Sequence, residues 1–197
     1  TGTYPISSTN AKNQTTEITY DPGTGNVLSK KDPNNNTTTY TYDVFGRISK
    51  EIQPYDTTTF PTTSYQYFFD GTAPEGIKIS KREISGAAGT LDLYTFTDGF
   101  DRKVQTRREA EDTALQIVSN TFYNTSGKVS KETVPHFDTA TTTYVTPLSG
   151  IKNVLTDYDV LDRVTKITNP DNTTKTITYD RWIVTNTNEK GNQTKHK

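Results

Sequence analysis

The sequence has no cysteine and no methionine, and only 29% of its 197 residues are hydrophobic. The absence of cysteine excludes disulfide bonds and thiolate metal sites. No apolar run approaches the length of about 20 residues that a membrane-spanning helix needs, and the first residues do not resemble a signal peptide. Because an initiator methionine is missing, we expect this sequence to be a segment of a longer chain.

An excess of basic charge is also missing, because 22 lysines and arginines face 23 acidic residues. Proteins that bind nucleic acid or anionic membrane surfaces concentrate basic side chains on one face. We therefore predict no nucleic-acid partner and no membrane insertion.

Aromatic residues are plentiful, with 12 tyrosines, 8 phenylalanines and 1 tryptophan. A disordered chain would have few aromatic or β-branched residues and a high net charge, whereas the net charge here is -1. Threonine, tyrosine, valine and isoleucine fit the pleated, half-buried surface of a strand. The composition therefore predicts an extended β-sheet with a large solvated area.

An internal repeat dominates the sequence. Its clearest copy, Tyr42–Ile48, reads Tyr-Asp-Val-Phe-Gly-Arg-Ile, and a close copy occupies Tyr158–Val164. Looser copies follow Tyr20, Thr97, Tyr123 and Tyr179. The residues that we single out as its structural signature are Tyr20, Asp21, Gly25, Tyr42, Asp43, Gly46, Arg47, Asp98, Arg102, Tyr123, Asn124, Gly127, Lys128, Tyr158, Asp159, Asp162, Arg163, Tyr179 and Asp180.

Each part of the repeat has a physical role. Large residues alternate with threonine before the aspartate, which predicts a strand with one buried face. The aspartate or asparagine then starts an Asx turn, in which its side chain accepts bonds from nearby backbone amides. Gly46 and its equivalents supply a positive φ. Asp101 and Asp162 replace that glycine in two copies, and aspartate tolerates the left-handed region.

A second strand follows each turn and ends at a proline and asparagine link, such as Asn169-Pro170-Asp171-Asn172. Each unit is thus a β-hairpin of about 20 residues. The spacing of Val164 and Ile167 breaks the strand alternation, so either a β-bulge restores the register or the outer face is partly covered. We predict an all-β fold in which tandem antiparallel hairpins form one continuous curved sheet.

The repeat, with its Asn-Pro-Asp-Asn-Thr-Thr tail, resembles the YD repeat of Rhs proteins, which include toxin-complex shell subunits, bacterial Rhs toxins and teneurins. We expect a poorly matched lead-in at residues 1–14 and a repeat array at 15–197, with a degenerate or inserted stretch at about 55–92. The resemblance implies a hollow β-shell that in the toxin members encloses a toxin domain, and a secreted or cell-surface location. The self-cleaving aspartic site of some relatives has no convincing counterpart here.

Candidate catalytic and metal-binding residues have simpler explanations. His136 and His196 are far apart in the sequence, and we interpret both as surface residues. The acidic residues Asp157, Asp159 and Asp162 lack the glycine and terminal glutamate of a calcium-binding EF-hand loop. We interpret the second acidic cluster as a solvated turn; it contains Glu109, Glu111 and Asp112. We predict no enzyme activity, no metal and no cofactor.

Tyrosines leave an alternative open, because exposed aromatic rings on a sheet can stack on sugars. We favour the interpretation that Tyr40, Tyr42, Tyr158 and Tyr179 fill one side of the sheet, with hydroxyls bonded to threonines. The predicted function is a non-catalytic structural module whose partners are other segments of the same large protein or an enclosed toxin domain. The alternative is an adhesion module that binds glycans or a receptor.

Overall fold

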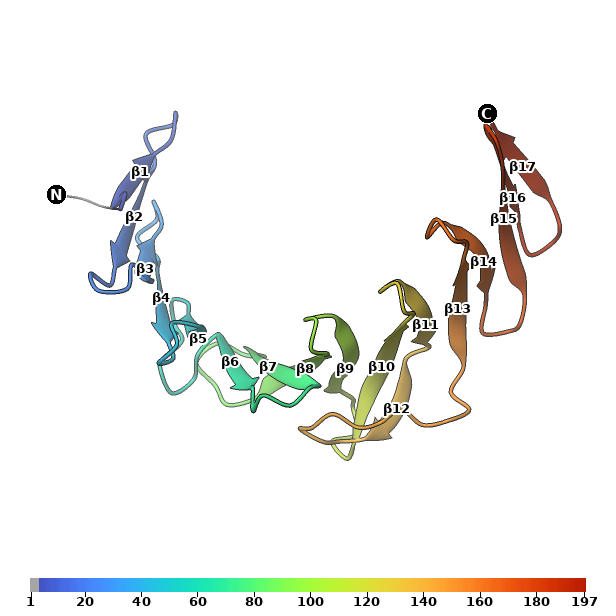
Figure 1. Ribbon diagram of the computed structural model, residues 1–197. Coiled ribbons are helices and arrows are strands. Elements are labelled where there is room, and N and C mark those ends of the chain that lie inside the picture. Colours follow the sequence, from blue (N-terminus) through green and yellow to red (C-terminus); the bar gives the residue numbers. More distant parts are fainter. Residues whose placement is uncertain (1–3) are drawn as a thin grey trace. The chain divides into compact units, whose positions relative to one another are not determined.

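The computed structural model describes residues 4–197 and is all-β, as predicted (Figure 1). Its 17 strands belong to an antiparallel sheet, and no residue from 4 to 197 is helical. Residues 1–3 of the predicted lead-in lie outside the described residues. The strands are β1 (Ser7–Thr9), β2 (Thr15–Tyr20), β3 (Val27–Lys31), β4 (Thr37–Tyr42), β5 (Ile48–Ile52), β6 (Thr63–Phe68), β7 (Glu75–Arg82), β8 (Thr90–Thr97), β9 (Lys103–Glu109), β10 (Leu115–Tyr123), β11 (Val129–Thr133), β12 (His136–Thr139), β13 (Asn153–Tyr158), β14 (Val164–Thr168), β15 (Thr174–Asp180), β16 (Ile183–Thr187) and β17 (Gln193–His196).

The chain divides into two compact units. The first contains the chain up to Phe68 together with Ile77–Tyr94. In it, β1 to β6 pair strictly in sequence order, each strand antiparallel to the next. Such nearest-neighbour pairing is the pattern that successive hairpins produce.

The second unit contains Phe69–Gly76 and Thr95–Lys197. From β13 to β17 the strands again pair in sequence order. Strand β10 departs from this pattern, because its one edge pairs with β9 and its other edge is shared between β11 and β12. Strand β11 then pairs with β13. Residues 140–150, within the chain between β12 and β13, are named the strap below.

A β-bulge next to the repeat turn decides between the two explanations of the broken alternation. In the pair β13–β14 the register shifts between Asp157 and Tyr158, so that Tyr158 faces Val164 and Thr156 faces Ile167. The bulge returns Val164 and Ile167 to one face of the sheet. The pairs β2–β3, β4–β5 and β10–β11 have the same shift.

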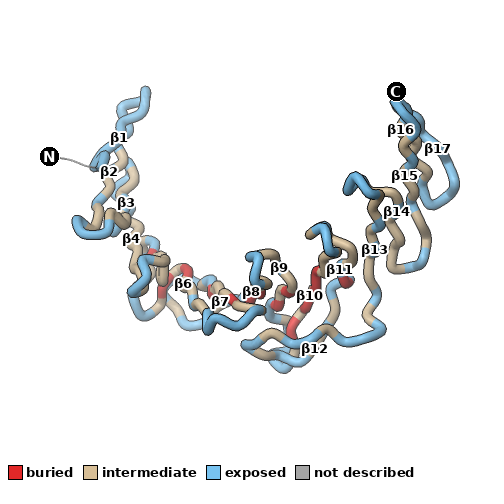
Figure 2. Tube along the Cα trace, in the orientation of Figure 1, coloured by how far each residue is buried: buried red, intermediate tan, exposed pale blue. Residues whose placement is uncertain are grey.

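The core is small and locally polar. In the first unit the buried hydrophobic residues are Ile52 and Tyr94, and in the second they are Phe96 and Val118. The strands β13 to β17 have no residue in the buried class, whereas β9 and β10 have several (Figure 2). Each hairpin is therefore stabilised chiefly by its neighbours in the sheet.

The predicted division of the chain stays a prediction. Strand β1 pairs with β2, so residues 7–9 of the predicted lead-in are part of the sheet. The stretch expected to be degenerate, about 55–92, contains β6 and β7.

Candidate functional site

The repeat turn is a five-residue unit with a fixed hydrogen-bond pattern. In one copy the Asp159 N–H donates to the Arg163 carbonyl at 2.9 Å, and the Asp162 N–H donates to the Asp159 carbonyl at 3.0 Å. The Asp159 carboxylate Oδ1 accepts the N–H groups of Leu161 at 2.9 Å and Arg163 at 3.0 Å. The predicted Asx turn is thus present. The same backbone bonds close Asp43–Arg47, Asp98–Arg102 and Asn124–Lys128.

The fourth residue of this turn is left-handed in every one of these copies. Gly46 has φ +78° and Gly127 has φ +77°. Asp101 and Asp162, which replace the glycine, have φ 58° and 59°. The prediction of a positive φ at this position is confirmed.

The links at the other end of the strands use the same turn, which the sequence analysis missed. The Asp32 N–H donates to the Asn36 carbonyl at 2.9 Å, and Asp32 Oδ1 accepts the N–H groups of Asn34 and Asn36, both at 2.8 Å. The sequence signal for these turns is an asparagine or glycine in the fourth position. The backbone of this residue is left-handed in all four links, at Asn13, Asn35, Asn172 and Gly191. The links that share these backbone bonds are Asn10–Gln14, Asp32–Asn36, Asn169–Thr173 and Asn188–Asn192.

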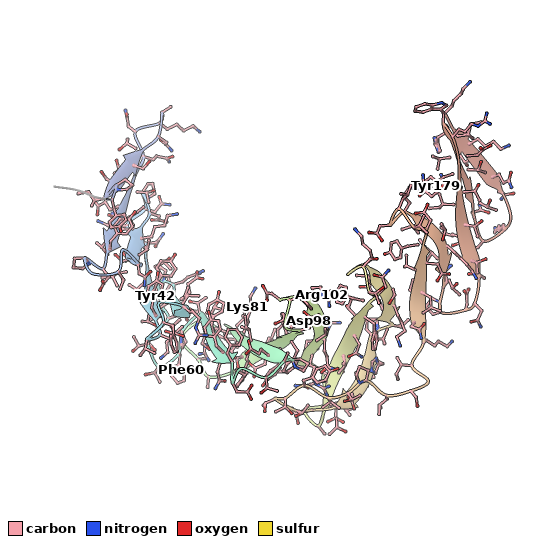
Figure 3. The ribbon with its side chains drawn as sticks, viewed as in Figure 1. Tyr42, Phe60, Lys81, Asp98, Arg102 and Tyr179 are labelled. Carbon is pink, nitrogen blue, oxygen red and sulfur yellow. The ribbon has the colours of Figure 1, made fainter. Side chains whose placement is uncertain are left out.

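In three of these copies the repeat turn adds an ion pair between its first and fifth residues. Asp159 Oδ2 lies 2.7 Å from Arg163 Nε and 2.6 Å from Arg163 Nη2. Bonds from the Arg163 side chain and backbone hold the pKa of the Asp159 carboxyl below its usual value. The equivalent pairs are Asp43–Arg47 and Asp98–Arg102, and Figure 3 shows Asp98 and Arg102 together at the turn between β8 and β9.

Each of these arginines also contacts the tyrosine of the following hairpin. The guanidinium carbon of Arg163 lies 4.1 Å from the ring centre of Tyr179, within the range of a cation–π interaction. The Tyr179 hydroxyl donates to the carbonyl of Val164, the residue after that arginine, at 3.1 Å. We name this combination of an Asp–Arg pair and the next tyrosine the inter-hairpin staple.

The staple recurs with the same geometry. The guanidinium carbon of Arg47 lies 4.2 Å from the centre of the Tyr67 ring, and the Tyr67 hydroxyl donates to the Ile48 carbonyl at 2.9 Å. Arg102 lies 4.5 Å from the Tyr123 ring, whose hydroxyl donates to the Lys103 carbonyl at 2.9 Å. The hydroxyl bond alone recurs from Tyr42 to Val27 and from Tyr158 to Val129.

These contacts correct one expectation. The hydroxyls of Tyr42, Tyr158 and Tyr179 bond to main-chain carbonyls and not to threonines. Threonines pair instead with serines across the opposite face, for example Thr19 with Ser29 at 2.6 Å. The predicted signature does not include Tyr67, which lies in the stretch expected to be degenerate, because the turn after it lacks the Asp-x-x-Gly pattern.

Two predicted signature copies are variants of this arrangement. At the first, Tyr20 donates to the Pro5 carbonyl at 3.2 Å, and its ring stacks on Tyr4 with ring centres 5.0 Å apart. Asp21 begins a longer turn in which Gly25 has φ +76°. At the last, Asp180 pairs with Ile183 across the β15–β16 hairpin.

The other candidate residues are not brought together. His136 Nδ1 contacts the Val134 carbonyl at 3.0 Å, and His196 lies in β17. Asp112 accepts the Ala114 N–H at 2.9 Å, as in a turn. Between residues 4 and 197, no group of three or more histidine or acidic side chains is placed to hold a metal ion. Nor does the described chain contain a helix that could cross a membrane.

Comparison with known proteins gives a match to a family model over part of the chain and a shared fold. Residues 20–58 match the RHS Repeat family model. The crystal structure of TcdB2-TccC3 superposes with a TM-score of 0.77 at 16% identity over 93% of this chain. The TcdB2-TccC3-Cdc42 crystal structure gives a TM-score of 0.77 at 13% identity over 93% of this chain. No curated protein matches.

The present chain corresponds to 12% of the chain in the first structure and 14% in the second. At such low identity the structures establish the fold alone. Together with the match to the family model, they confirm the resemblance to YD-repeat (Rhs) proteins.

Proposed function

We propose, from the premise that this chain is a YD-repeat sheet, that it is a non-catalytic wall segment of a large secreted or surface protein. In this role it encloses or displays a toxin or another partner domain of the same assembly. Rhs-type shells and the structures named above supply the analogy. The wall function itself is our inference for this chain.

The inter-hairpin staple is the observation that supports this proposal. In Asp159 one carboxylate oxygen binds turn amides and the other binds Arg163. That arginine then stacks on Tyr179, whose hydroxyl binds a carbonyl of the preceding hairpin. The polar groups of the signature thus connect one hairpin to the next. A side chain committed in this way serves the sheet and is poorly placed for acid–base chemistry.

A substitution series tests the non-catalytic assignment. Asp159→Asn and Glu109→Gln should leave any background hydrolase or transferase activity unchanged, whereas Asp159→Asn should lower stability. The same panel of substrates is assayed with all proteins at matched concentration. Turnover by the unmodified chain that either substitution abolishes would show that the chain is an enzyme.

The enclosing role is tested separately on the full-length protein. Sequencing the coding region on both sides of this segment should reveal further YD repeats and an adjacent domain of different composition. If the flanking regions contain no further repeats, the segment cannot be part of an enclosing wall.

Glycan or receptor binding is a second candidate, supported by exposed aromatic rings at the turn tips. Phe45 is 79% exposed, Phe100 is 82% exposed and Trp182 is 85% exposed. Such rings can stack on the apolar face of a sugar. A glycan array probed with the unmodified chain and with Trp182→Ala tests this role. Equal signals from the two proteins, or none, count against it.

A further inference from the structure

The strap lies against β9 and β10 through its backbone. Its first residue, Ala140, donates its N–H to the Ala114 carbonyl at 2.9 Å. The Thr141 N–H donates to Gln116 Oε1 at 3.1 Å. Further along, Gln105 Nε2 donates to the Val145 carbonyl at 2.8 Å, and Gln105 Oε1 accepts the Val145 N–H at 3.4 Å. The strap contains no strand, yet side chains hold its backbone on the sheet.

The side chains that hold the strap form a polar cluster, which we name the seat. Gln105 is 1% exposed, Arg107 is 0% exposed and Gln116 is 5% exposed. They are fixed by each other, since Arg107 Nε donates to Gln116 Oε1 at 2.8 Å and Arg107 Nη1 to Gln105 Oε1 at 3.3 Å. The Asp138 carboxylate balances the charge of the buried guanidinium, with its Oδ2 atom 3.3 Å from Arg107 Nη2.

One aromatic contact adds side-chain recognition. The Tyr144 ring of the strap meets Phe96 of β8 edge to face, with ring centres 6.1 Å apart at 70°. Burial raises the pKa of the Tyr144 hydroxyl. The neighbouring strap residues remain open, with Val145 37% exposed and Leu148 60% exposed. The strap thus contacts the sheet through its backbone bonds and through the Tyr144 ring.

This combination is the chemistry of extended-peptide recognition. Backbone bonds give affinity with little dependence on sequence, and a pocket for one side chain gives selectivity. We propose that the seat formed by Gln105, Arg107, Gln116 and Phe96 binds an extended polypeptide segment with one aromatic residue, and that the strap occupies it in place of such a segment. The partner in this proposal is an extended part of the enclosed or displayed chain. Only this identity of the partner rests on the proposed wall function.

The strap has the advantage of being tethered. A segment on a short linker acts at an effective concentration in the millimolar range, so a separate peptide of equal intrinsic affinity competes poorly. Binding in trans should accordingly be weak while the strap is intact and should increase when the strap is removed from the seat.

The test uses the full chain and a fluorescein-labelled peptide with the sequence of residues 141–149, Thr-Thr-Thr-Tyr-Val-Thr-Pro-Leu-Ser. In the open variant a Gly-Ser linker of equal length replaces these residues, so that Asp138 stays beside Arg107. Fluorescence anisotropy should show saturable binding to the open variant, at least tenfold tighter than to the unmodified chain. The matched control peptide has alanine in the place of Tyr144 and should bind at least tenfold more weakly.

Two results would overturn the proposal. One is an open variant with an unchanged far-UV circular dichroism spectrum that binds no peptide. The other is equal binding of the tyrosine and alanine peptides. If the open variant does not fold, Tyr144→Ala in the intact chain replaces it. Because its strap lacks the aromatic ring, this variant should bind the tyrosine peptide more tightly than the unmodified chain does, and equal binding by the two proteins would overturn the proposal. Since the flanking sequence does not enter this assay, failure here leaves the wall function untouched.

Discussion

Replacement of Gly46 by valine isolates the conformational requirement of the repeat turn. Gly46 has φ +78°, and its N–H donates to the Asp43 carbonyl at 3.0 Å. A Cβ atom built at this position would have Asn26 Nδ2 as its nearest neighbour at 3.6 Å, an ordinary contact. The added Cβ atom itself therefore causes no clash, and the expected cost is that of the left-handed backbone. That cost is about 1–2 kcal/mol for an L-residue with a Cβ atom.

Urea unfolding followed by circular dichroism measures this loss, and hydrogen exchange at residues 43–47 shows whether it is local. The matched variant is Gly46→Asp, because Asp101 and Asp162 occupy the same turn position at φ 58° and 59°. It should cost clearly less than valine. Gly99→Ala is the control, since no atom lies within 4 Å of its Cβ position, and it should change stability by less than about 0.5 kcal/mol.

Two outcomes would refute this reasoning. If Gly46→Val unfolds at the same urea concentration as Gly99→Ala, the left-handed backbone costs nothing. If Gly46→Asp is as destabilising as Gly46→Val, the aspartates at the equivalent positions are not explained by conformation.

Three further predictions concern the staple and the seat. Tyr179→Phe should lose the bond to Val164 and lower the unfolding free energy by about 0.5–1.5 kcal/mol, measured by urea titration; an unchanged midpoint would deny the bond a stabilising role. Because the folded pKa of Asp159 is depressed, its stabilisation should be present above the unfolded value of about 3.9 and be lost as pH falls through the folded value; Asp159→Asn should flatten the acid limb of a stability–pH profile, and an unaltered limb contradicts this. Asp138→Ala should cost about 3–5 kcal/mol, because it leaves the Arg107 charge buried without its carboxylate; thermal denaturation that matches the unmodified chain would contradict the burial of that charge.

Local features of the fold could be predicted from the sequence, because residue type alone determines them. The Asx turn at Asp159 and the positive φ of Gly46 each depend on atoms within five residues, so the repeat pattern was sufficient. The tyrosine contacts could not be obtained in this way. The acceptor of the Tyr67 hydroxyl is the carbonyl of Ile48, 19 residues away, and a main-chain carbonyl has no signal in a sequence.

The strap seat was beyond sequence reasoning for a related reason. The bond between Gln105 and Val145 joins residues 40 apart, and buried glutamine and arginine are rare enough that a polar stretch is normally interpreted as surface. The sequence suggested a role for the acidic cluster Glu109, Glu111 and Asp112, as a solvated turn. It suggested none for neighbouring Arg107, which is 0% exposed.

The inter-hairpin staple also bears on how such a chain can change in length during evolution. Each staple joins one hairpin only to its successor, as Arg163 and Val164 do with Tyr179. A duplication or deletion whose two breakpoints fall at equivalent places in the repeat therefore creates a junction that already has its arginine, its carbonyl and its tyrosine. A breakpoint out of phase separates the arginine from the next tyrosine and leaves a defective junction. Recombination between copies should consequently produce folded walls of different lengths, with their boundaries at multiples of a whole hairpin.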